Sequence, residues 1–558
     1  MHELGKLRDQ RQFDLSPQAP TRLAMIHRSF RTVSMRRGIS RQQFAAHFPA
    51  LGLLNLAHSL RVDAASGKLF LPEIKYFDEE VYTGEDELVK AVTHWLGNSP
   101  RRIIAASAYT STIDYLETFL SYFDTCRYLI IVGGAHATLA PDIENAHIVV
   151  RGEGGAAIRH ILTKLFTSEF GKGPDAAGIC YCLDGQMVNQ KQAFDRSLEV
   201  LPSPAFAYDL LSNKGQEGPV YATNFTRMLG QRPQIYICTQ SCKARCSFCS
   251  TYLIHGKAVA RPIELIRDDL EYLIHGQGYD SLEFHDDDLL QHPNFFELLR
   301  LLKKLGIPWF CYARVDMITH EVAKMMADAG CRRVFIGIES MHQVNLDYYN
   351  KKTSVERNGQ AVEALAHAGI GAVAGFIIGA PHDTLESILQ DLDNFLELPL
   401  FAINCSILSP DPGTVEFYRA RKRGGDFIAA LGGENRIRLI PDTKKYGIET
   451  PVGLPSVCEA VSKIDLNNLL SLIDAEFYFR PQIWKGLTNG RTVKQVNLIR
   501  LYYLYLLKSL EKLNPDKTHR AIIEQANDLR GRFQTKFWQE QVFGNLSLGI
   551  THIEGIKQ

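Results

Sequence analysis

The first 200 residues alternate short apolar runs with amphipathic stretches. Five runs have the length and composition of buried strands, and they lie at 22–27, 74–77, 102–107, 128–134 and 148–150. Between and after them, residues 114–123 and 155–166 show the apolar spacing of helices. This alternation is typical of a doubly wound parallel sheet, and a hairpin-like pair at 178–189 closes the unit. We therefore expect a Rossmann-like α/β fold here.

A second series of strands and helices follows a segment with little periodicity. Residues 201–232 carry Pro, Ser, Gly and Asn, so we predict a linker there. Six further strand candidates lie at 234–238, 281–284, 308–312, 334–338, 372–378 and 403–408. Amphipathic helices such as 295–304 and 355–368 separate them. Six such units predict a partial (β/α)6 barrel, whose chemistry would lie at the carboxyl ends of its strands.

The pattern becomes helical beyond about residue 440, as in 496–513. A chain of 558 residues is long enough for several cores. We expect an α/β protein with four parts: a Rossmann-like domain with an N-terminal extension, a linker, a partial barrel and a helical C-terminal domain. Their predicted bounds are 1–200, 201–232, 233–440 and 441–558.

Composition narrows the class of partner and the location. Lys and Arg together number 62, equal to Asp and Glu, so no net field attracts nucleic acid, and we expect no nucleic-acid partner. No apolar run approaches the ~18 residues of a membrane span, and residues 1–15 lack the apolar core of a secretory signal. The chain has 11 cysteines, which suits reduced thiols. We expect a cytoplasmic protein without a membrane span.

The strongest chemical signal is a cluster of three cysteines directly after the strand candidate at 234–238. Cys242, Cys246 and Cys249 are spaced by four and three residues. Three thiolates in one loop can hold three irons of a 4Fe-4S cluster and leave the fourth iron open to another ligand. Lys243 and Arg245 lie beside them and favour the ionised thiolates.

A zinc site is the alternative for this loop. Cys238 or His255 would then supply the fourth ligand. Structural zinc sites usually combine paired cysteines that are two residues apart, and the spacing here fits that pattern poorly.

Further motifs give this cysteine loop a context. In chain order they are FHDDDLL (284–290), CYARVD (311–316), AGCRRVFIGIES (329–340), GFIIGAPHDTLE (375–386) and ILSPDPGT (407–414), with IIVGGAHATLAPD (130–142) and VVRGEGG (149–155) upstream. Together with the cysteine loop they resemble the cobalamin-binding branch of the radical S-adenosylmethionine (SAM) enzymes, whose known members include class B methyltransferases. The match runs from about residue 50 to 420. The resemblance implies three cofactors: a 4Fe-4S cluster, S-adenosylmethionine and cobalamin.

In the barrel, the resemblance implies that S-adenosylmethionine binds at the open iron. An external electron donor of the flavodoxin or ferredoxin type would supply the electron that releases a 5′-deoxyadenosyl radical. The residues implied in cofactor binding are Phe248 and Gly375 and Gly379 near the adenine, Asp286 and Asp287 at the ammonium, and Arg314 and Glu339 at the carboxylate and ribose. Other interpretations stay open, in which Phe248 fills the loop, the acids are solvated, or Arg314 pairs with Glu339.

In the first unit, the resemblance implies that glycines let a corrinoid lie against the backbone. The residues implied at the cobalamin face and its nucleotide-tail groove are Ser107, Thr110, Gly133, Gly134, His136, Gly152 and Glu153. The Asp-x-His-x-x-Gly motif that supplies a histidine to cobalt elsewhere is absent, so His136 is interpreted as a wall residue. Gln240, Ser241 and Gly155 also depart from the family pattern.

The combination predicts a methyltransferase that moves a methyl group from methylcobalamin to an unactivated carbon of a small-molecule substrate. The sequence assigns no catalytic side chain. A rearrangement, cyclisation or oxidation with the same cofactors is the first alternative, and a cobalamin-binding regulator or zinc-stabilised interaction protein is an alternative of another class. The C-terminal aromatics are expected to be core residues, namely Tyr478, Trp484, Tyr502, Tyr503 and Tyr505.

Overall fold

The computed structural model describes residues 19–28, 49–165, 176–183, 186–193, 203–211, 228–422, 456–491 and 493–543. The first unit is a seven-stranded sheet in the order β2-β1-β3-β4-β5-β6-β7. Five strands are parallel: β1 (Thr21–His27), β2 (Glu73–Asp78), β3 (Arg101–Ser107), β4 (Leu129–Gly133) and β5 (Ile148–Val150). The hairpin β6 (Ile179–Leu183) and β7 (Gln186–Asn189) continues the sheet antiparallel. The five predicted strands and the hairpin are confirmed.

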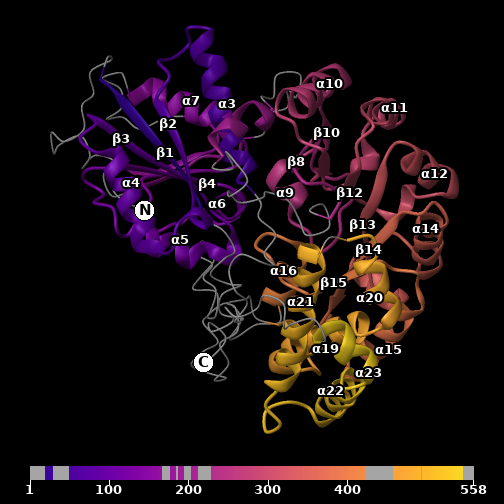
Figure 1. Cartoon of the computed structure of the whole chain (residues 1–558). Helices are drawn as coiled ribbons and strands as arrows, with labels where there is room; N and C mark the ends of the chain where they lie inside the picture. Colours follow the sequence, from indigo (N-terminus) through magenta and orange to yellow (C-terminus); the bar gives the residue numbers. More distant parts are fainter. Residues whose placement is uncertain are drawn as a thin grey trace.

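Helices cover both faces of this sheet (Figure 1). Successive strand residues alternate between two cores. Leu23 and Met25 pack with α3 (Leu51–Ala65) and α7 (Gly154–Leu165), whereas Ala24 and Ile26 pack with α4 (Glu85–Leu96) and α5 (Ile113–Leu120). The unit is therefore doubly wound, as predicted. Because the chain moves from β2 past β1 to β3, the carboxyl edge has a switch point of the kind where such sheets bind ligands.

The second sheet has six strands, all parallel, in the order β15-β14-β13-β12-β11-β8. They are β8 (Pro233–Tyr236), β11 (Ser281–Phe284), β12 (Trp309–Ala313), β13 (Cys331–Glu339), β14 (Gly371–Ile378) and β15 (Ala402–Ile407). The helices between them include α10 (Ile263–Glu271), α11 (Phe295–Leu305), α12 (His320–Asp328), α14 (Val355–His367) and α15 (Leu385–Glu397). All six strand candidates are confirmed, and the helices lie outside the curved sheet (Figure 1).

The C-terminal helices pack beside β15, the edge strand of the second sheet. They are α19 (Lys463–Tyr478), α20 (Pro481–Thr488), α21 (Val493–Glu511), α22 (Arg520–Phe533) and α23 (Lys536–Trp538). The Tyr478 hydroxyl donates to the Ile403 carbonyl at 3.0 Å, which fixes α19 to β15. Trp484 and Tyr503 are buried with ring centroids 4.9 Å apart, and Tyr502 and Tyr505 are half-buried. These aromatics are core residues, as predicted.

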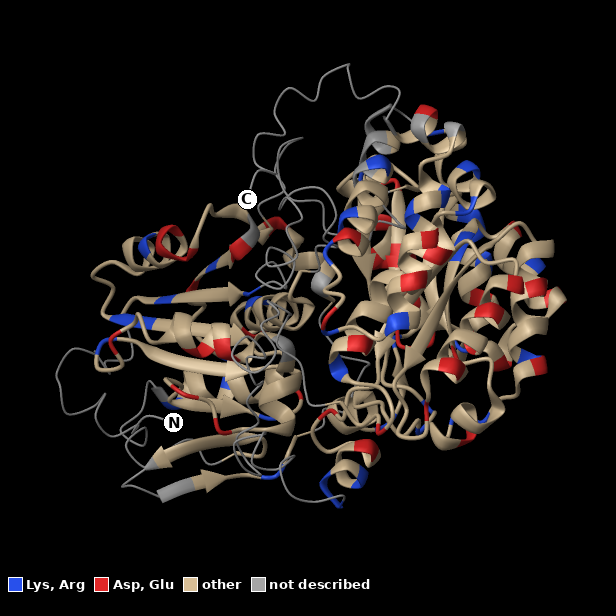
Figure 2. Ribbon diagram, turned by 90° about the horizontal axis from the view of Figure 1, so that it is seen from below, with Lys and Arg blue, Asp and Glu red and all other residues tan. Residues whose placement is uncertain are grey.

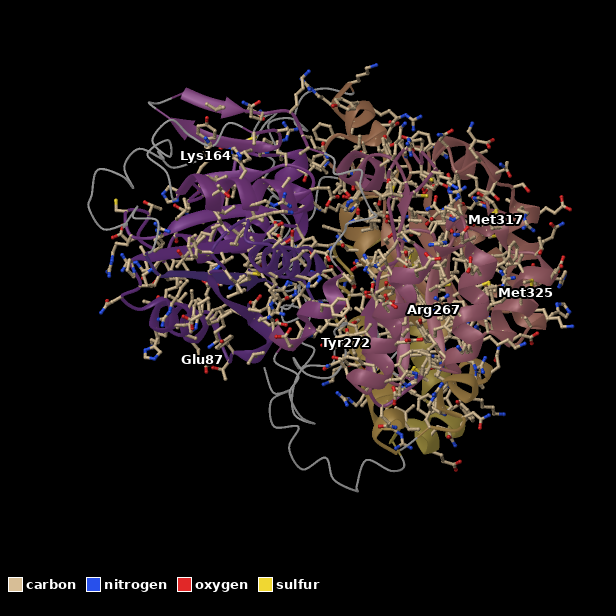
Figure 3. All side chains as sticks on the ribbon, turned by 90° about the horizontal axis from the view of Figure 1, so that it is seen from above. Glu87, Lys164, Arg267, Tyr272, Met317 and Met325 are labelled. Carbon is tan, nitrogen blue, oxygen red and sulfur yellow. The ribbon has the colours of Figure 1, made fainter. Side chains whose placement is uncertain are left out.

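Part of the predicted linker is structured. The 3₁₀ helix η5 (Pro204–Leu210) places Phe206 against α3, with its ring 5.2 Å from His58. The same ring lies 4.9 Å from Tyr272, which lies where the two units meet (Figure 3). Residues 212–227 and the predicted boundary at 440 lie outside the described residues. The division into four domains stays a prediction.

Charged side chains of both signs are interspersed over the two units (Figure 2). This distribution agrees with a formal net charge of zero. Among the helices that the structure describes, none combines the length and apolarity that crossing a bilayer requires.

Candidate active site

A cavity of about 330 Å³ lies at the carboxyl ends of the barrel strands. It is bounded by the loop after β8 and by the ends of β11, β12 and β13. The residues that line it are Cys242, Ala244, Cys246, Phe248, Cys249, Thr251, Tyr252, His285, Asp286, Asp287, Tyr312, Ala313, Arg314, Phe335, Gly337, Glu339 and Lys351. Eight of the predicted barrel residues therefore meet in one place, at the edge where this architecture concentrates its chemistry.

The three cysteines share one wall of this cavity. Their loop is held from outside, because the Ser247 amide donates to the Tyr349 carbonyl at 2.8 Å. Burial raises the pKa of both Cys242 and Cys249. Within the described ranges, no three His, Cys, Asp or Glu side chains converge as closely as a single metal ion needs. A cubane cluster does not require that convergence, since each thiolate binds a different iron.

The two residues suggested as a fourth zinc ligand have other partners. Cys238 is 2% exposed and lies beside Asp286, and burial raises its thiol pKa well above the usual range. His255 ends α9 (Thr251–His255), and its Nδ1 atom lies 3.4 Å from Glu153 Oε1. Neither residue lines the cavity with the three thiols. The arrangement therefore gives no support to the zinc interpretation.

Asp286 is a buried carboxylate with one oxygen unused. Its Oδ1 atom accepts hydrogen bonds from the amides of Cys238 and Thr239 and from the Thr239 hydroxyl at 2.6 Å. Its Oδ2 atom is buried without a hydrogen-bond partner in the structure. Burial raises the pKa of Asp286 to about 6. Because a buried polar atom is normally satisfied, this oxygen marks a place where a ligand donor fits.

The acids that follow Asp286 have different positions. Asp287 also lines the cavity, where its Oδ1 atom accepts from the Thr251 hydroxyl at 3.0 Å. Asp288 does not line the cavity and accepts from the Arg314 amide at 3.4 Å. The structure thus selects Asp286 and Asp287 as the pair that faces the cavity.

Arg314 and Glu339 do not pair with each other, so that open interpretation is wrong. Arg314 forms an ion pair with Asp316 at 2.7 Å, and its Nη1 atom lies 3.5 Å from the Cys246 sulfur. Glu339 Oε1 instead accepts from Lys351 Nζ at 2.6 Å.

Lys351 is a site residue that the motifs did not identify. It is 4% exposed, lines the cavity and neutralises Glu339. Glu339 has φ +67°, a left-handed conformation that is strained in a residue with a side chain. A β carbon at Gly337 would lie 2.5 Å from Glu339 Oε1 and 2.6 Å from Lys351 Nζ, so the pair needs glycine there.

Glu283, Tyr312 and His285 form a second polar group that the sequence did not indicate. The Tyr312 hydroxyl donates to Glu283 Oε1 at 3.1 Å, and His285 Nδ1 lies 3.3 Å from the same oxygen. Glu283 is fully buried, while Tyr312 and His285 line the cavity. Alternation along β11 and β12 could have placed them on the inner face, but no residue pattern marked them as functional.

The remaining predicted barrel residues have mixed positions. Phe248 lines the cavity and packs edge-on against Tyr349 at 5.5 Å between centroids. Gly375 is not a lining residue, and a β carbon there would lie 3.2 Å from Glu339 Oε2. Gly379 has φ +86°, and its amide donates to Asp383 at 2.9 Å. The two glycines therefore shape the backbone around the site.

In the first unit, the glycine pair allows β3 and β4 to approach closely at their carboxyl ends. Gly134 has φ +97°, and a β carbon there would lie 2.7 Å from Ser107 Oγ and 2.9 Å from the Ala108 carbonyl oxygen. Gly133 ends β4, opposite Ser107 in the register. The backbone at the end of β4 therefore packs tightly against the end of β3.

His136 lies behind this edge. It belongs to the short helix α6 (Ala135–Leu139), is 2% exposed, and its Nδ1 atom lies 3.1 Å from Thr110 Oγ1. Burial lowers its pKa to about 4, so the imidazole is neutral near neutral pH. Its role as a wall residue of a cobalamin site stays a prediction, and its burial is compatible with that role.

The loop after β5 brings the two units into contact. Gly152 has φ +85°, its amide donates to Thr138 Oγ1 at 3.0 Å, and a β carbon there would overlap the Ala193 carbonyl oxygen. Glu153 follows and reaches His255 of α9. Gln192 adds hydrogen bonds from Nε2 to the Leu253 and Ile254 carbonyls at 2.8 and 2.9 Å. The carboxyl edge of the first sheet thus contacts the helix that begins two residues after Cys249.

Comparison with known families supports the resemblance drawn from the motifs. Residues 236–395 match the sequence profile of the Radical SAM superfamily. An uncharacterized methyltransferase of Pyrococcus horikoshii is 25% identical over 67% of this chain and 78% of its own length. The bacteriochlorophyllide d C-12(1)-methyltransferase of Chlorobaculum tepidum is 25% identical, over 53% of this chain, and the match spans only 60% of that enzyme.

Solved structures show the same fold. The radical S-adenosylmethionine methyltransferase TsrM from Kitasatospora setae, solved with tryptophan and aza-SAM, has a TM-score of 0.55 at 15% identity, covering 72% of this chain and 76% of that chain. The cobalamin-dependent S-adenosylmethionine radical enzyme OxsB, solved with aqua-cobalamin and S-adenosylmethionine, has a TM-score of 0.56 at 17% identity, covering 92% and 75%. The predicted resemblance to cobalamin-binding radical SAM enzymes is confirmed.

Proposed function

The chain carries a radical SAM domain and resembles the cobalamin-dependent radical SAM enzymes, and we propose that it is a methyltransferase. It would move a methyl group from methylcobalamin to an unactivated carbon of a small-molecule substrate. One observation carries this proposal. The loop that holds Glu153, at the glycine-rich edge of the first sheet, contacts His255 of the helix that follows the three cysteines. Two cofactor sites that meet in this way can act on one substrate.

The residues of the cavity fit the cluster and S-adenosylmethionine. Cys242, Cys246 and Cys249 would hold the 4Fe-4S cluster and leave one iron for the amino acid end of S-adenosylmethionine. The unused Oδ2 atom of Asp286 would accept a hydrogen bond from the ammonium group. Arg314, beside the Cys246 sulfur, would hold the carboxylate. Positive charge near the thiols also favours their ionised form.

The carboxyl edge of the first sheet fits cobalamin. Gly133, Gly134 and Gly152 allow the strand ends and their loops to pack closely at the edge where open α/β sheets bind ligands, and a flat macrocycle would lie against this edge. His136 is buried against Thr110, so it would support this wall and would not reach cobalt. When bound, the three cofactors supply a 5′-deoxyadenosyl radical and a transferable methyl group, while the chain supplies their placement.

Electron supply and substrate class are part of the same proposal. An external donor of the flavodoxin or ferredoxin type would reduce the cluster. A small molecule is the expected substrate, and the structurally similar methyltransferase TsrM, solved with its substrate tryptophan, supports this. The relatives named as methyltransferases act as supporting evidence for methyl transfer.

Oxidative cyclisation with the same cofactors is the second candidate. It is favoured by a relative named anaerobic magnesium-protoporphyrin IX monomethyl ester cyclase, from Cereibacter sphaeroides, which is 25% identical over 75% of this chain and 65% of its own length. Product mass separates the two: methylation adds one CH₂ unit to the substrate, whereas cyclisation by oxidation removes hydrogen.

The experiment is anaerobic reconstitution with iron, sulfide and cobalamin, followed by reduction and addition of S-adenosylmethionine. We expect 5′-deoxyadenosine, and S-adenosylhomocysteine from methylation of reduced cobalamin. A holoprotein with full iron and cobalamin content that forms neither product would favour the regulator or interaction-protein alternative. Formation of 5′-deoxyadenosine without S-adenosylhomocysteine would favour the non-methylating enzyme.

A further inference from the structure

The loop that carries the three cysteines has an inner and an outer face. Ala244 lines the cavity between the cysteines, whereas its two neighbours, Lys243 and Arg245, are exposed. The Lys243 amide donates to Gln291 Oε1 at 2.9 Å, which fixes this part of the loop. Arg245 lies over the ring of Tyr252, with its guanidinium carbon 4.7 Å from the ring centroid. The outer face is therefore cationic, and the proposed cluster would lie directly behind it.

Lys352 adds a third cation from the segment that follows α13 (Gln343–Tyr348). Asn350 of this segment donates from Nδ2 to the Arg245 carbonyl at 2.7 Å, so the segment lies beside the cysteine loop. Lys352 is exposed, whereas Lys351 before it is buried in an ion pair. We call the three exposed cations the cation surface: Lys243, Arg245 and Lys352.

The charge of the cation surface is not neutralised by neighbouring carboxylates. Within the residues that the structure describes, none of its three cations forms an ion pair. Two exposed acids lie nearby in the sequence, on α13 and α14. Asp347 accepts from Gln343 Nε2 at 2.9 Å, and Glu356 accepts from Gln360 Nε2 at 3.1 Å. These contacts hold both acids on their own helices, so the cation surface suits a partner of negative charge.

An exposed apolar pair borders the cation surface on α16 (Val415–Lys422). The Glu416 amide donates to the Ser247 carbonyl at 3.0 Å, which places the first turn of this helix against the cysteine loop. Val415 and Tyr418 lie three residues apart, on one face of α16, and are 43% and 53% exposed. Apolar and aromatic side chains next to unpaired cations suit the binding of a protein of opposite charge.

We propose that the cation surface and this apolar pair bind a flavodoxin, an acidic carrier protein that donates electrons singly. The inference rests on the proposed function, since a redox cluster behind the loop is what needs such a partner. Acidic side chains around the flavin would meet the cation surface, and the apolar dimethylbenzene edge of the flavin would contact Val415 and Tyr418. A ferredoxin offers no such edge, because its cluster is held by thiolates.

The transfer at this surface involves one electron and no change in covalent bonds. The flavin hydroquinone of the donor is oxidised to the semiquinone, and the oxidised cluster is reduced by the same electron. Complexes of this kind are typically small and weak, and their rates of association depend on charge. The cation surface would therefore act mainly on how tightly and how fast the donor binds.

The test is calorimetric titration of the reconstituted full-length protein with oxidised flavodoxin at low ionic strength. We expect saturable binding that weakens as salt is added, because salt screens exposed charges. The double variant Lys243→Gln, Lys352→Gln should bind about fivefold more weakly and with a smaller salt dependence. Lys352→Gln alone, which lies outside the cysteine loop, should bind about twofold more weakly. Iron and sulfide content shows that each sample retains its cluster.

The matched control is the double variant Lys303→Gln, Lys304→Gln. It removes two exposed lysines from the last turn of α11, at the opposite end of the barrel strands, and should bind flavodoxin as the unaltered protein does. Equal binding by the two double variants, or no binding by the unaltered protein, would overturn the docking surface. Tighter binding of a ferredoxin than of flavodoxin would overturn the choice of partner.

Formation of 5′-deoxyadenosine with dithionite separates this inference from the proposed function. Dithionite is a small reductant that needs no docking surface. Protein that forms 5′-deoxyadenosine with dithionite but fails the binding test would overturn the docking surface and leave the proposed function intact. Fully loaded protein that forms none with dithionite would overturn the proposed function, and the need for a flavodoxin with it.

Discussion

Glu153 Oε1 and His255 Nδ1 lie 3.4 Å apart, and they join the loop after β5 to the last residue of α9. Burial lowers the pKa of His255, but the hydrogen bond and charge of Glu153 outweigh it, so the pKa is raised overall. The contact therefore links the glycine-rich edge of the first sheet to the segment that follows the cysteine loop. Together with the hydrogen bonds from Gln192 to the Leu253 and Ile254 carbonyls, it holds the two proposed cofactor sites next to each other.

Replacing this carboxylate should uncouple the two half-reactions. In Glu153→Gln, formation of 5′-deoxyadenosine should stay near normal, because the residues that surround S-adenosylmethionine lie within the barrel. The rate of methyl transfer should fall several-fold, since that step needs the cobalamin site and the S-adenosylmethionine site in the correct relative position. The ratio of the two products, measured in one reaction, checks this. Glu73→Gln, which removes an exposed ion pair with Arg22 at the far edge of the same sheet, is the control; an equal ratio in both variants would contradict the coupling role.

The cysteine assignment predicts a sharp difference between neighbouring thiols. Cys246→Ala should lose the 4Fe-4S cluster, because each of the three thiolates holds a separate iron. Cys238→Ala should retain it, since Cys238 is buried beside Asp286 outside the cavity lining. Iron, sulfide and zinc content after anaerobic reconstitution measure both. Stoichiometric zinc that disappears in Cys238→Ala would refute the cluster.

Lys351 should be essential for binding S-adenosylmethionine in the cavity, because it neutralises Glu339. Lys351→Met keeps most of the length of the side chain but leaves the Glu339 carboxylate buried without its cation. In comparable buried pairs this loss lowers the free energy of unfolding by ~3–5 kcal/mol. We expect at least a tenfold loss of S-adenosylmethionine affinity in a titration of the reconstituted protein. The double variant Lys351→Met, Glu339→Gln should recover stability, and failure of the second change to restore any stability would argue against the pair.

Asp286 should give the cofactor-free protein a distinct pH dependence. Its pKa is about 6 in the folded protein because of burial, against an ordinary value of 3.8, so the folded state holds more protons between these values. Stability from this group is therefore highest in acid and falls as the pH rises through about 6. Asp286→Asn removes the ionisation and should be more stable than the unaltered protein near pH 7.5, by up to about 3 kcal/mol.

The difference in stability between Asp286→Asn and the unaltered protein should shrink toward about pH 5, where Asp286 is mostly protonated in the folded protein. Urea unfolding at the two pH values measures it. The same variant should bind S-adenosylmethionine more weakly, because the oxygen that faces the cavity no longer carries charge. A stability difference that is constant with pH would show that Asp286 is ionised in the folded state.

His136 should leave the cobalt spectrum unchanged. The side chain is 2% exposed and its Nδ1 atom lies 3.1 Å from Thr110 Oγ1, so we expect the imidazole to stay in the wall and not to bind cobalt. In His136→Asn the electron paramagnetic resonance spectrum of cob(II)alamin should keep the same nitrogen hyperfine pattern as in the unaltered protein. Loss of a nitrogen splitting would show that the imidazole reaches cobalt.

Local patterns predicted the elements because parallel strands covered on both faces have continuous apolar runs, as in 102–107 and 372–378. The cysteine loop was equally visible, since its three ligands lie within eight residues of sequence. Gly134 could be identified because a close strand approach excludes a side chain.

Contacts between distant segments could not be predicted in the same way. Lys351 is more than 100 residues from Cys249 in the sequence. It reaches Glu339 in the cavity because the chain folds back after β13 through α13 (Gln343–Tyr348). The same holds for Tyr312 and Glu283, which meet through strand pairing. η5 within the predicted linker was missed because Phe206 is fixed by tertiary packing against α3 and Tyr272, which no local composition indicates.

The central claim is that the cluster and the corrinoid face one space. Electron paramagnetic resonance of the reduced holoprotein tests it directly, because a reduced 4Fe-4S cluster and cob(II)alamin each carry an unpaired spin. We predict that each signal is broadened or relaxed by the other. The cob(II)alamin signal should return to its isolated form in Cys246→Ala, which lacks the cluster, and the cluster signal should do so in protein without cobalamin. Two independent, unperturbed spectra from fully loaded protein would contradict the claim.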